Sequence, residues 1–262
     1  MLASRLAIAI PGIVLAIVVV AVGDPLFAAV VLAVALIALF ELFNLLADLG
    51  PLRWAGYASV TVTLVLAWLV DPAERAVLFG VGLAIGLSAV AGLILKRRED
   101  VVVRVATTLF AAVYIGVPMG LLVATRELPH GAAAVANVLV GTWAFDTLSY
   151  AGGRLWGATP VAPRISPGKT LEGLLVGLAG GILAVWIAGL YMDWIGSLDS
   201  LVLGIVISVT AYVGDLFESL LKRSVGVKDS GRLLAGHGGV LDRFDAILFT
   251  AVAGYFATVW LT

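Results

Sequence analysis

Acidic and hydroxyl side chains recur at helical spacing in the second half of this 262-residue chain, in types that suit metal and phosphate chemistry. Four residues at i, i+3, i+4 and i+7 would share one face of a helix: Asp215, Glu218, Ser219 and Lys222. Asp242 and Asp245 repeat the i, i+3 spacing further along the chain. Asp146 is followed at i+3 and i+4 by Ser149 and Tyr150. These three segments could direct carboxylates toward one point.

Clustered carboxylates repel one another unless something neutralises them. A hard cation such as Mg²⁺, which prefers oxygen ligands, is the usual solution where phosphates are also handled. The alternative is internal salt bridging between these acids and Lys222, Arg223 and Arg243. His237 lies between glycines, where it could cap a turn, although we favour a hydrogen bond to phosphate or to a metal-bound water.

The segment 152–170 combines basic residues with four glycines and three prolines. Its Arg154, Arg164 and Lys169 supply charge for phosphate, and glycines let backbone amides approach it closely. Ser166 and Pro167 have the pattern of a helix N-cap followed by proline at the first helical position. A helix starting there would direct its positive end at the loop. The alternative interpretation is a well-capped helix after a flexible loop.

The composition decides what kind of molecule holds these residues. Hydrophobic residues make up 62% of the chain, charged residues only 13%, and the mean hydropathy is +1.13, values that exclude a soluble globular domain. The absence of cysteine excludes disulfides, thiolate chemistry and cysteine-bound zinc. We expect no nucleic-acid partner. Charge inside apolar spans is costly in a bilayer, so the acidic residues mark a functional site.

Apolar stretches of about 20 residues predict nine transmembrane helices in an all-α, polytopic membrane protein. The predicted spans are 4–23, 26–48, 52–70, 75–95, 102–124, 132–151, 171–192, 199–220 and 242–261. We expect the first, which shares features with a secretory signal, to remain as an uncleaved helix. Residues 1–130 would form a scaffold and possible oligomer interface. Residues 131–262 would form the catalytic region, with cytoplasmic loops 152–170 and 221–241.

The distribution of basic residues predicts the orientation. With the N-terminus in the cytoplasm and the C-terminus on the opposite side, every Lys and Arg except Arg75 and Arg126 faces the cytoplasm. The cluster KRRED at 96–100 would then lie near anionic headgroups. The acidic and basic residues described above would also face the cytoplasm, where nucleotides are available.

The residues from Ser219 to Asp245, SLLKRSVGVKDSGRLLAGHGGVLDRFD, closely resemble the signature of the phosphatidate cytidylyltransferases, or CDP-diacylglycerol synthases. The upstream stretches DTLSYAGGRLWG and ISPGKTLEG resemble a second conserved region of that family. The resemblance covers about residues 146–245. Two positions depart from the family pattern: Ala235 replaces a usual proline, and Gly168 replaces a common lysine, which weakens one phosphate contact.

The resemblance implies a Mg²⁺-dependent reaction in which CTP and phosphatidic acid give CDP-diacylglycerol and pyrophosphate. It leaves room for a second, monovalent ion such as K⁺. It also implies a homodimer among membrane lipids, in a bacterial-type inner membrane, with the active site facing the cytoplasm.

The resemblance also assigns roles to individual residues. Asp215 and Asp242 are the expected metal ligands, with Asp146 and Asp245 next. Lys222 and Arg223 would contact substrate phosphate, helped by a hydrogen bond from Ser219. The remaining substrate-binding or catalytic candidates, which would close over CTP or hold its triphosphate, are Arg154, Arg164, Ser166, Lys169, Lys228, Asp229, His237 and Arg243.

Two other functions are compatible with a charged membrane protein. In a CTP-dependent lipid kinase of the dolichol type, the lipid would attack the γ-phosphorus of CTP and not the α-phosphorus. An ion-coupled transporter would carry repeats between its halves and acids near mid-span, and the sequence has neither pattern.

Overall fold

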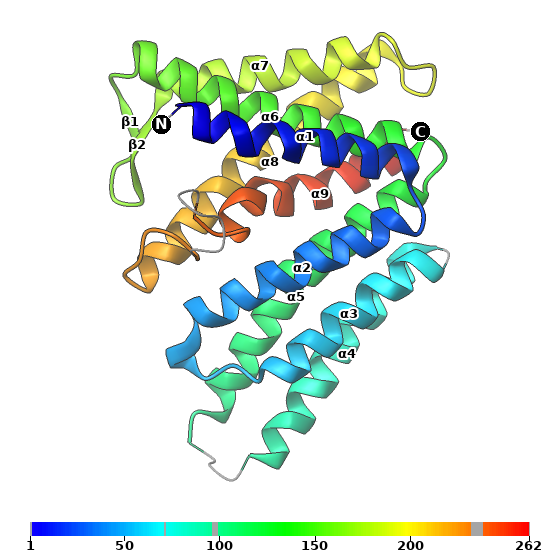
Figure 1. Cartoon of the computed structure of the whole chain (residues 1–262), viewed down its shortest axis with the longest axis vertical. Helices are drawn as coiled ribbons and strands as arrows, with labels where there is room; N and C mark the ends of the chain where they lie inside the picture. The colour runs from blue at the N-terminus through cyan, green and yellow to red at the C-terminus, as the bar shows by residue number, and fades with distance from the viewer. Residues whose placement is uncertain (1, 71, 96–98, 232–237, 262) are drawn as a thin grey trace. The chain divides into compact units, whose positions relative to one another are not determined.

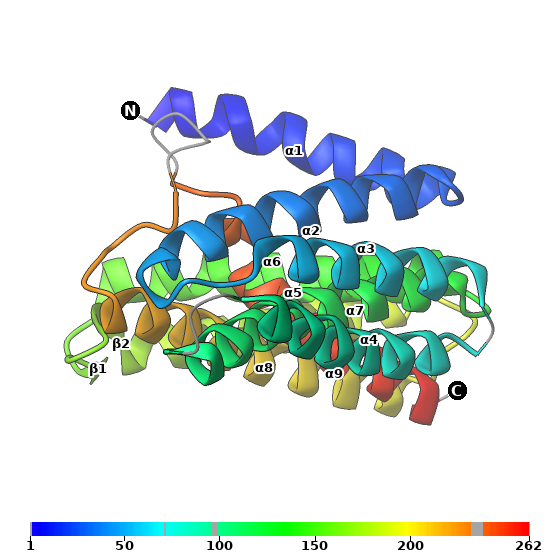
Figure 2. The ribbon, with the colours of Figure 1, turned by 90° about the horizontal axis from the view of Figure 1, so that it is seen from below.

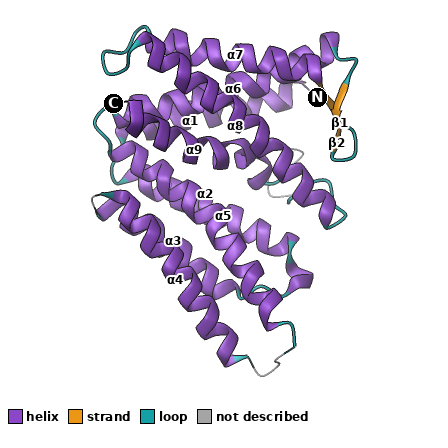
Figure 3. Cartoon of the chain, turned by 180° about the vertical axis from the view of Figure 1, so that it is seen from behind, coloured by secondary structure: helices purple, strands orange, loops and turns teal. Residues whose placement is uncertain are grey.

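The structure, a computed structural model, describes residues 2–70, 72–95, 99–231 and 238–261. Within these ranges the chain is helical apart from one short strand pair and the connecting turns (Figure 3). The elements are α1 (Leu2–Val22), α2 (Leu26–Leu45), the short η1 (Ala47–Leu49), α3 (Arg53–Leu69), α4 (Ala73–Ile94), α5 (Val101–Glu127), α6 (Gly131–Trp156), β1 (Pro160–Ala162), β2 (Ser166–Thr170), α7 (Leu171–Gly189), α8 (Ser197–Ser224) and α9 (Leu241–Leu261). The predicted helices agree closely with these; the largest difference is α6, which continues to Trp156.

Seven of these helices are long and apolar enough to cross a membrane: α2 and α4–α9. This confirms a polytopic integral membrane protein. Large apolar side chains on α4, including Leu78, Phe79 and Leu93, are exposed, which suits a helix that faces lipid. The count of nine spans stays a prediction, because α3 has only 17 residues and the apolar part of α1, Pro11–Val22, is shorter still. The orientation of the spans also stays a prediction.

The chain divides into two compact units, residues 1–132 with 230–241, and residues 133–229 with 242–262. In the first unit, α2, α3, α4 and α5 lie side by side (Figure 1). The chain turns sharply between α1 and α2, as Figure 2 shows. Fully buried side chains, among them Phe43, Leu64 and Met119, fill the space between these helices. The scaffold role of residues 1–130 stays a prediction.

In the second unit, α7 packs against α6 through a stripe of glycines. A Cβ atom on Gly173 would lie 2.7 Å from the carbonyl oxygen of Ser149, and one on Gly177 would lie 2.9 Å from that of Phe145. Gly181 repeats this arrangement one turn further along α7. The two backbones therefore approach as closely as small residues allow, which is how helices commonly associate in membranes.

The segment between α6 and α7 is a hairpin of β1 and β2, which pair antiparallel. Gly152, Gly153 and Arg154 belong to α6 and not to this loop. A Cβ on Gly152 would lie 2.7 Å from the Val176 side chain, so this glycine permits helix packing. The loop predicted at 152–170 therefore begins only after Trp156.

Candidate active site

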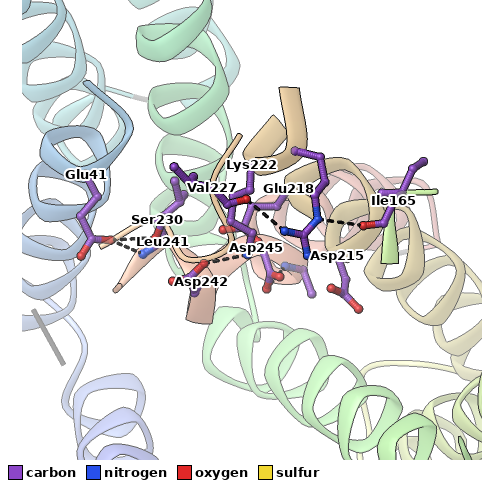
Figure 4. Close-up of polar contacts among 12 residues, drawn as sticks. Glu41, Ile165, Asp215, Glu218, Lys222, Val227, Ser230, Leu241, Asp242 and Asp245 are labelled. Atoms are coloured by element: carbon purple, nitrogen blue, oxygen red, sulfur yellow. Dashed lines mark hydrogen bonds and ion pairs between the residues drawn. The ribbon is translucent and has the colours of Figure 1, made fainter. Parts of the chain in front are cut away.

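All four residues of the predicted polar stripe lie on α8, and Lys222, the last of them, pairs with two acids. The Lys222 Nζ atom lies 2.6 Å from Glu218 Oε2 on the same helix and 2.7 Å from Asp242 Oδ1 on α9 (Figure 4). The Glu218 side chain is only 1% exposed. A buried carboxylate needs a partner of opposite charge, so one ammonium group neutralises two acids.

The other acids gather beside this triad in the second unit. Asp146 on α6 and Asp215 on α8 lie near enough to Asp245 on α9 for their charges to interact. Asp215 is paired with Lys169 of β2, whose Nζ lies 2.8 Å from its Oδ1. Acids from α6, α8 and α9 thus interact, although Asp215, Glu218 and Asp242 are each paired with a lysine.

The N-cap predicted at Ser166 and Pro167 is wrong. Both residues lie in β2, and α7 begins at Leu171, where the Thr170 hydroxyl oxygen accepts a hydrogen bond from the Gly173 N–H at 3.3 Å. The backbone of Thr170 is extended, so it ends the strand and caps the helix at once. Proline is tolerated in such a short, exposed hairpin strand.

Glu172, in the first turn of α7, closes the base of the hairpin. Its carboxylate accepts hydrogen bonds from the Ala158 N–H at 3.0 Å, the Thr159 N–H at 3.2 Å and the Thr159 hydroxyl at 2.9 Å. Across the hairpin, Arg223 Nε donates to the Ile165 carbonyl at 3.3 Å (Figure 4). Glu172, Arg223 and the Lys169 ion pair together hold the hairpin against α7 and α8.

The other predicted substrate-binding residues are at the surface of the second unit. Arg154 is exposed, and its Nη1 donates to the Tyr150 hydroxyl at 3.1 Å. Arg164, Lys228, Asp229 and Arg243 are exposed, and Ser219 is half-buried. Their basic groups are accessible to an anion. His237 lies outside the described residues, as do Lys96, Arg97, Arg98 and Arg232.

Carboxylate oxygens are the right ligand type for Mg²⁺, and the interacting charges of Asp146, Asp215 and Asp245 favour a cation. The arrangement is not that of a formed metal site: among the residues that the structure describes, no three His, Asp or Glu side chains are grouped to hold an ion. Asp242 pairs instead with Lys222, as in the salt-bridge alternative, and Asp215 pairs with Lys169, which that alternative did not include. The metal ligands therefore stay a prediction.

Two buried acids were missing from the predicted site. Glu218 was seen in the stripe but given no role, whereas its near-complete burial makes it the group that most needs Lys222. Glu41, in α2 of the first unit, was not singled out, although it is a charge inside an apolar span. The same signal that points to Asp146, a charged residue inside an apolar span, also points to Glu41.

Comparison with known proteins agrees with this set of residues. A model of the cytidylyltransferase family matches residues 3–261. The chain belongs to this family. Membership of this family confirms the resemblance seen in the motifs.

Several members of the family are similar to part of the chain. The phosphatidate cytidylyltransferase of Thermotoga maritima is 41% identical over 131 residues, 48% of this chain and 48% of that protein. The phosphatidate cytidylyltransferase of Mycobacterium tuberculosis is 40% identical over 157 residues, 58% of this chain and 46% of the relative. The uncharacterized protein YnbB of Escherichia coli is 41% identical over 131 residues, 50% of this chain and 44% of that protein. The matched part is about half the length of these relatives.

Proposed function

We propose that this protein transfers CMP from CTP to phosphatidic acid, giving CDP-diacylglycerol and pyrophosphate. The family match and the relatives named phosphatidate cytidylyltransferase support the reaction class. The observation that carries the proposal is the ion-paired cluster of Lys169, Asp215, Lys222 and Asp242, which lies within the family's motifs. Its lysines can exchange carboxylate oxygens for phosphate oxygens.

In the proposed reaction a phosphate oxygen of the lipid attacks the α-phosphorus of CTP. The bond from that phosphorus to the bridging oxygen breaks, and pyrophosphate leaves with the bond's electrons. A phosphate monoester is already a nucleophile near neutral pH, so the protein has little acid or base work to do. Its task is to bring two anions together in line and to neutralise their charge.

The described cations supply that charge. Lys169 on the hairpin and Lys222 on α8 each hold a carboxylate that a polyanionic substrate would displace. Arg223 orients the hairpin through Ile165 and presents its exposed guanidinium beside it. The acyl chains would stay in the bilayer while the lipid phosphate reaches the polar end of α8.

Magnesium, and K⁺ as a second ion, are part of the proposal. Asp146, Asp215 and Asp245, whose negative charges interact, are the proposed ligands together with Asp242, which would be available once Lys222 binds phosphate. A bound divalent ion would neutralise charge on the triphosphate. The cytoplasmic orientation of the site and the homodimer are proposed on the same resemblance.

The deciding experiment measures pyrophosphate release by the purified protein in detergent with CTP, phosphatidic acid and Mg²⁺. We expect a CDP-lipid product, and we expect chelation and Asp242→Asn each to reduce the rate at least about 100-fold, because charge neutralisation at a phosphoryl group is among the largest catalytic effects. Release of CDP with a lipid alcohol would indicate the kinase reaction instead. Full activity of Asp242→Asn would remove Asp242 from the site.

A further inference from the structure

Glu41 is a carboxylate buried near the C-terminal end of an apolar membrane helix. It lies on α2, between Phe40 and Leu42, and is only 2% exposed. A charge in this position is costly unless specific donors satisfy it. Its donors come from a part of the chain about 200 residues away.

Both donors flank one segment of the signature region, within the first unit. Glu41 Oε2 accepts a hydrogen bond from the Leu241 N–H at 2.8 Å and a longer one from the Ser230 hydroxyl at 3.4 Å (Figure 4). Ser230 and Leu241 are the two ends of the segment that folds with the first unit. One carboxylate therefore fastens both ends of that segment.

The glycines next to these donors make room for the carboxylate. A Cβ atom on Gly231 would lie 2.6 Å from Glu41 Oε1, and one on Gly239 would collide with Glu41 Oε2 and the Ser230 hydroxyl. Gly231 and Gly239 have ordinary φ angles, so no left-handed conformation demands a glycine at either position. Close approach of Glu41 is the reason that the structure offers for both.

The contact at Leu241 caps a helix from another part of the chain. Leu241 is the first residue of α9, and the first N–H groups of a helix have no partner within it. A carboxylate there also benefits from the positive end of the helix dipole. Glu41 thus fixes where α9 starts, and Asp242, the partner of Lys222, is the next residue.

We propose that Glu41 is a positioning residue for cytidylyl transfer: by holding Ser230 and Leu241 it fixes the chain next to Lys228 and Asp229 and the start of α9. The inference rests on the proposed function, since the segment follows Lys228 and Asp229 and precedes Asp242. Glu41 acts through these residues and touches no substrate. Loss of its hydrogen bonds to Ser230 and Leu241 loosens the residues proposed to contact CTP and leaves the fold of α2 intact.

The first test is hydrogen exchange of the full-length protein in detergent, followed by mass spectrometry. Glu41→Ala removes the acceptor, so we expect the amides around Leu241 to exchange about tenfold faster or more. Glu41→Gln keeps a carbonyl oxygen at the same place, and we expect exchange close to that of the wild type. Wild-type exchange around Leu241 in Glu41→Ala overturns the inference.

Leu42→Ala is the matched control for general loss of stability. Leu42 is fully buried on the same helix, and its side chain has neither a hydrogen-bond donor nor an acceptor. We expect Leu42→Ala to lower the midpoint of thermal unfolding without selectively speeding exchange around Leu241. The same local pattern in both variants would show that Glu41 merely contributes to packing.

A second test changes the residues that contact Glu41 and leaves Glu41 itself in place. Gly231→Ala places a methyl group against the Glu41 carboxylate, so we expect it to speed exchange around Leu241 as Glu41→Ala does. In the Glu41→Ala background the methyl group has room, because the three nearest atoms at that position all belong to the Glu41 side chain, and Gly231→Ala should add little. Fully additive effects of the two substitutions contradict a shared contact.

The kinetic readout separates positioning from folding. We expect Glu41→Ala to raise KM for CTP about tenfold while KM for phosphatidic acid stays within about twofold, since Lys228 and Asp229, which precede Ser230, are then held less firmly. Glu41→Gln should restore most of the loss. If the wild type lacks cytidylyltransferase activity, the proposed function fails while the exchange data still decide the tether. If the wild type is active and Glu41→Ala keeps its KM for CTP, the positioning role fails alone.

Discussion

At the scale of single residues, the arrangement around Lys222 sets the electrostatics of the site. One ammonium group faces Glu218 and Asp242, and the three side chains are exposed by 14%, 1% and 11%. Removing one partner of a buried ion pair is costly because an uncompensated charge remains. The lysine is therefore needed for stability as well as for the proposed contact with phosphate.

We predict that Lys222→Met destabilises the protein by about 3–5 kcal/mol and abolishes pyrophosphate release, because Glu218 loses its counter-charge. Thermal unfolding in detergent and the pyrophosphate assay measure the two effects. The double variant Lys222→Met/Glu218→Gln should recover part of the stability and none of the activity. Recovery of activity in the double variant would show that Lys222 serves only to neutralise Glu218.

At the scale of elements, the β1–β2 hairpin depends on Glu172 at the start of α7. Its carboxylate receives three hydrogen bonds from Ala158 and Thr159, which lie just before β1 at the base of the hairpin. The hairpin also carries Lys169, which pairs with Asp215. A loosened hairpin would move this lysine away from α8.

We predict that Glu172→Ala speeds amide exchange across residues 158–170 and raises KM for CTP several-fold, with the unfolding midpoint little changed because the site is exposed. Exchange mass spectrometry and steady-state kinetics measure this. Asp199→Ala, which removes an acidic residue from the first turn of α8, is the matched control and should leave the hairpin unaffected. Equal exchange in Glu172→Ala and wild type would contradict the prediction.

The glycine stripe of α7 gives a second prediction for an element. Gly177→Ala adds a methyl group against Ser149 and the Phe145 carbonyl, so we expect a loss of about 1–3 kcal/mol from overpacking. Gly86→Ala on α4 meets nothing within 4 Å and should be neutral or slightly stabilising. Unfolding midpoints in detergent compare the two. An equal effect at both positions would indicate that helix propensity, not close packing, decides.

At the scale of the whole molecule, the open question is whether α3 crosses the membrane. Its 17 residues span about 25 Å as a helix, somewhat less than the hydrocarbon core of about 30 Å. A short span can be accommodated by thinning of the bilayer. The basic residues favour crossing, since Arg53 and Arg75 then lie on opposite sides.

The chain has no cysteine, so single cysteines can report this topology directly. We predict that Asp48→Cys is protected from a membrane-impermeant maleimide added outside intact cells and that Ala73→Cys is labelled. Asp193→Cys and Gly168→Cys should behave as an outside and an inside position. Labelling of positions 48 and 73 from the same side would mean that α3 does not cross.

The helices and much of the candidate site could be predicted from sequence because both depend on local patterns. Hydropathy located each helix, and the i, i+3 spacing placed Asp215 and Glu218 on one face of α8. The hairpin was missed because Ser166 and Pro167 match a cap locally, whereas pairing with Pro160–Ala162 and the contacts of Glu172 decided the outcome. Local preference yields where tertiary hydrogen bonds are available.

By itself, the sequence determined that this is a polytopic membrane protein of the cytidylyltransferase type, since composition, helical period and a fixed motif are all written along the chain. Only the tertiary structure decided which acids pair with Lys169 and Lys222, and that Glu41 holds Leu241. Apart from Glu218 and Lys222, which are i, i+4 neighbours on α8, the partners in these contacts lie from 20 to 200 residues apart, so no local period relates them. Folding brings them together because a buried charge is stable only beside its partner.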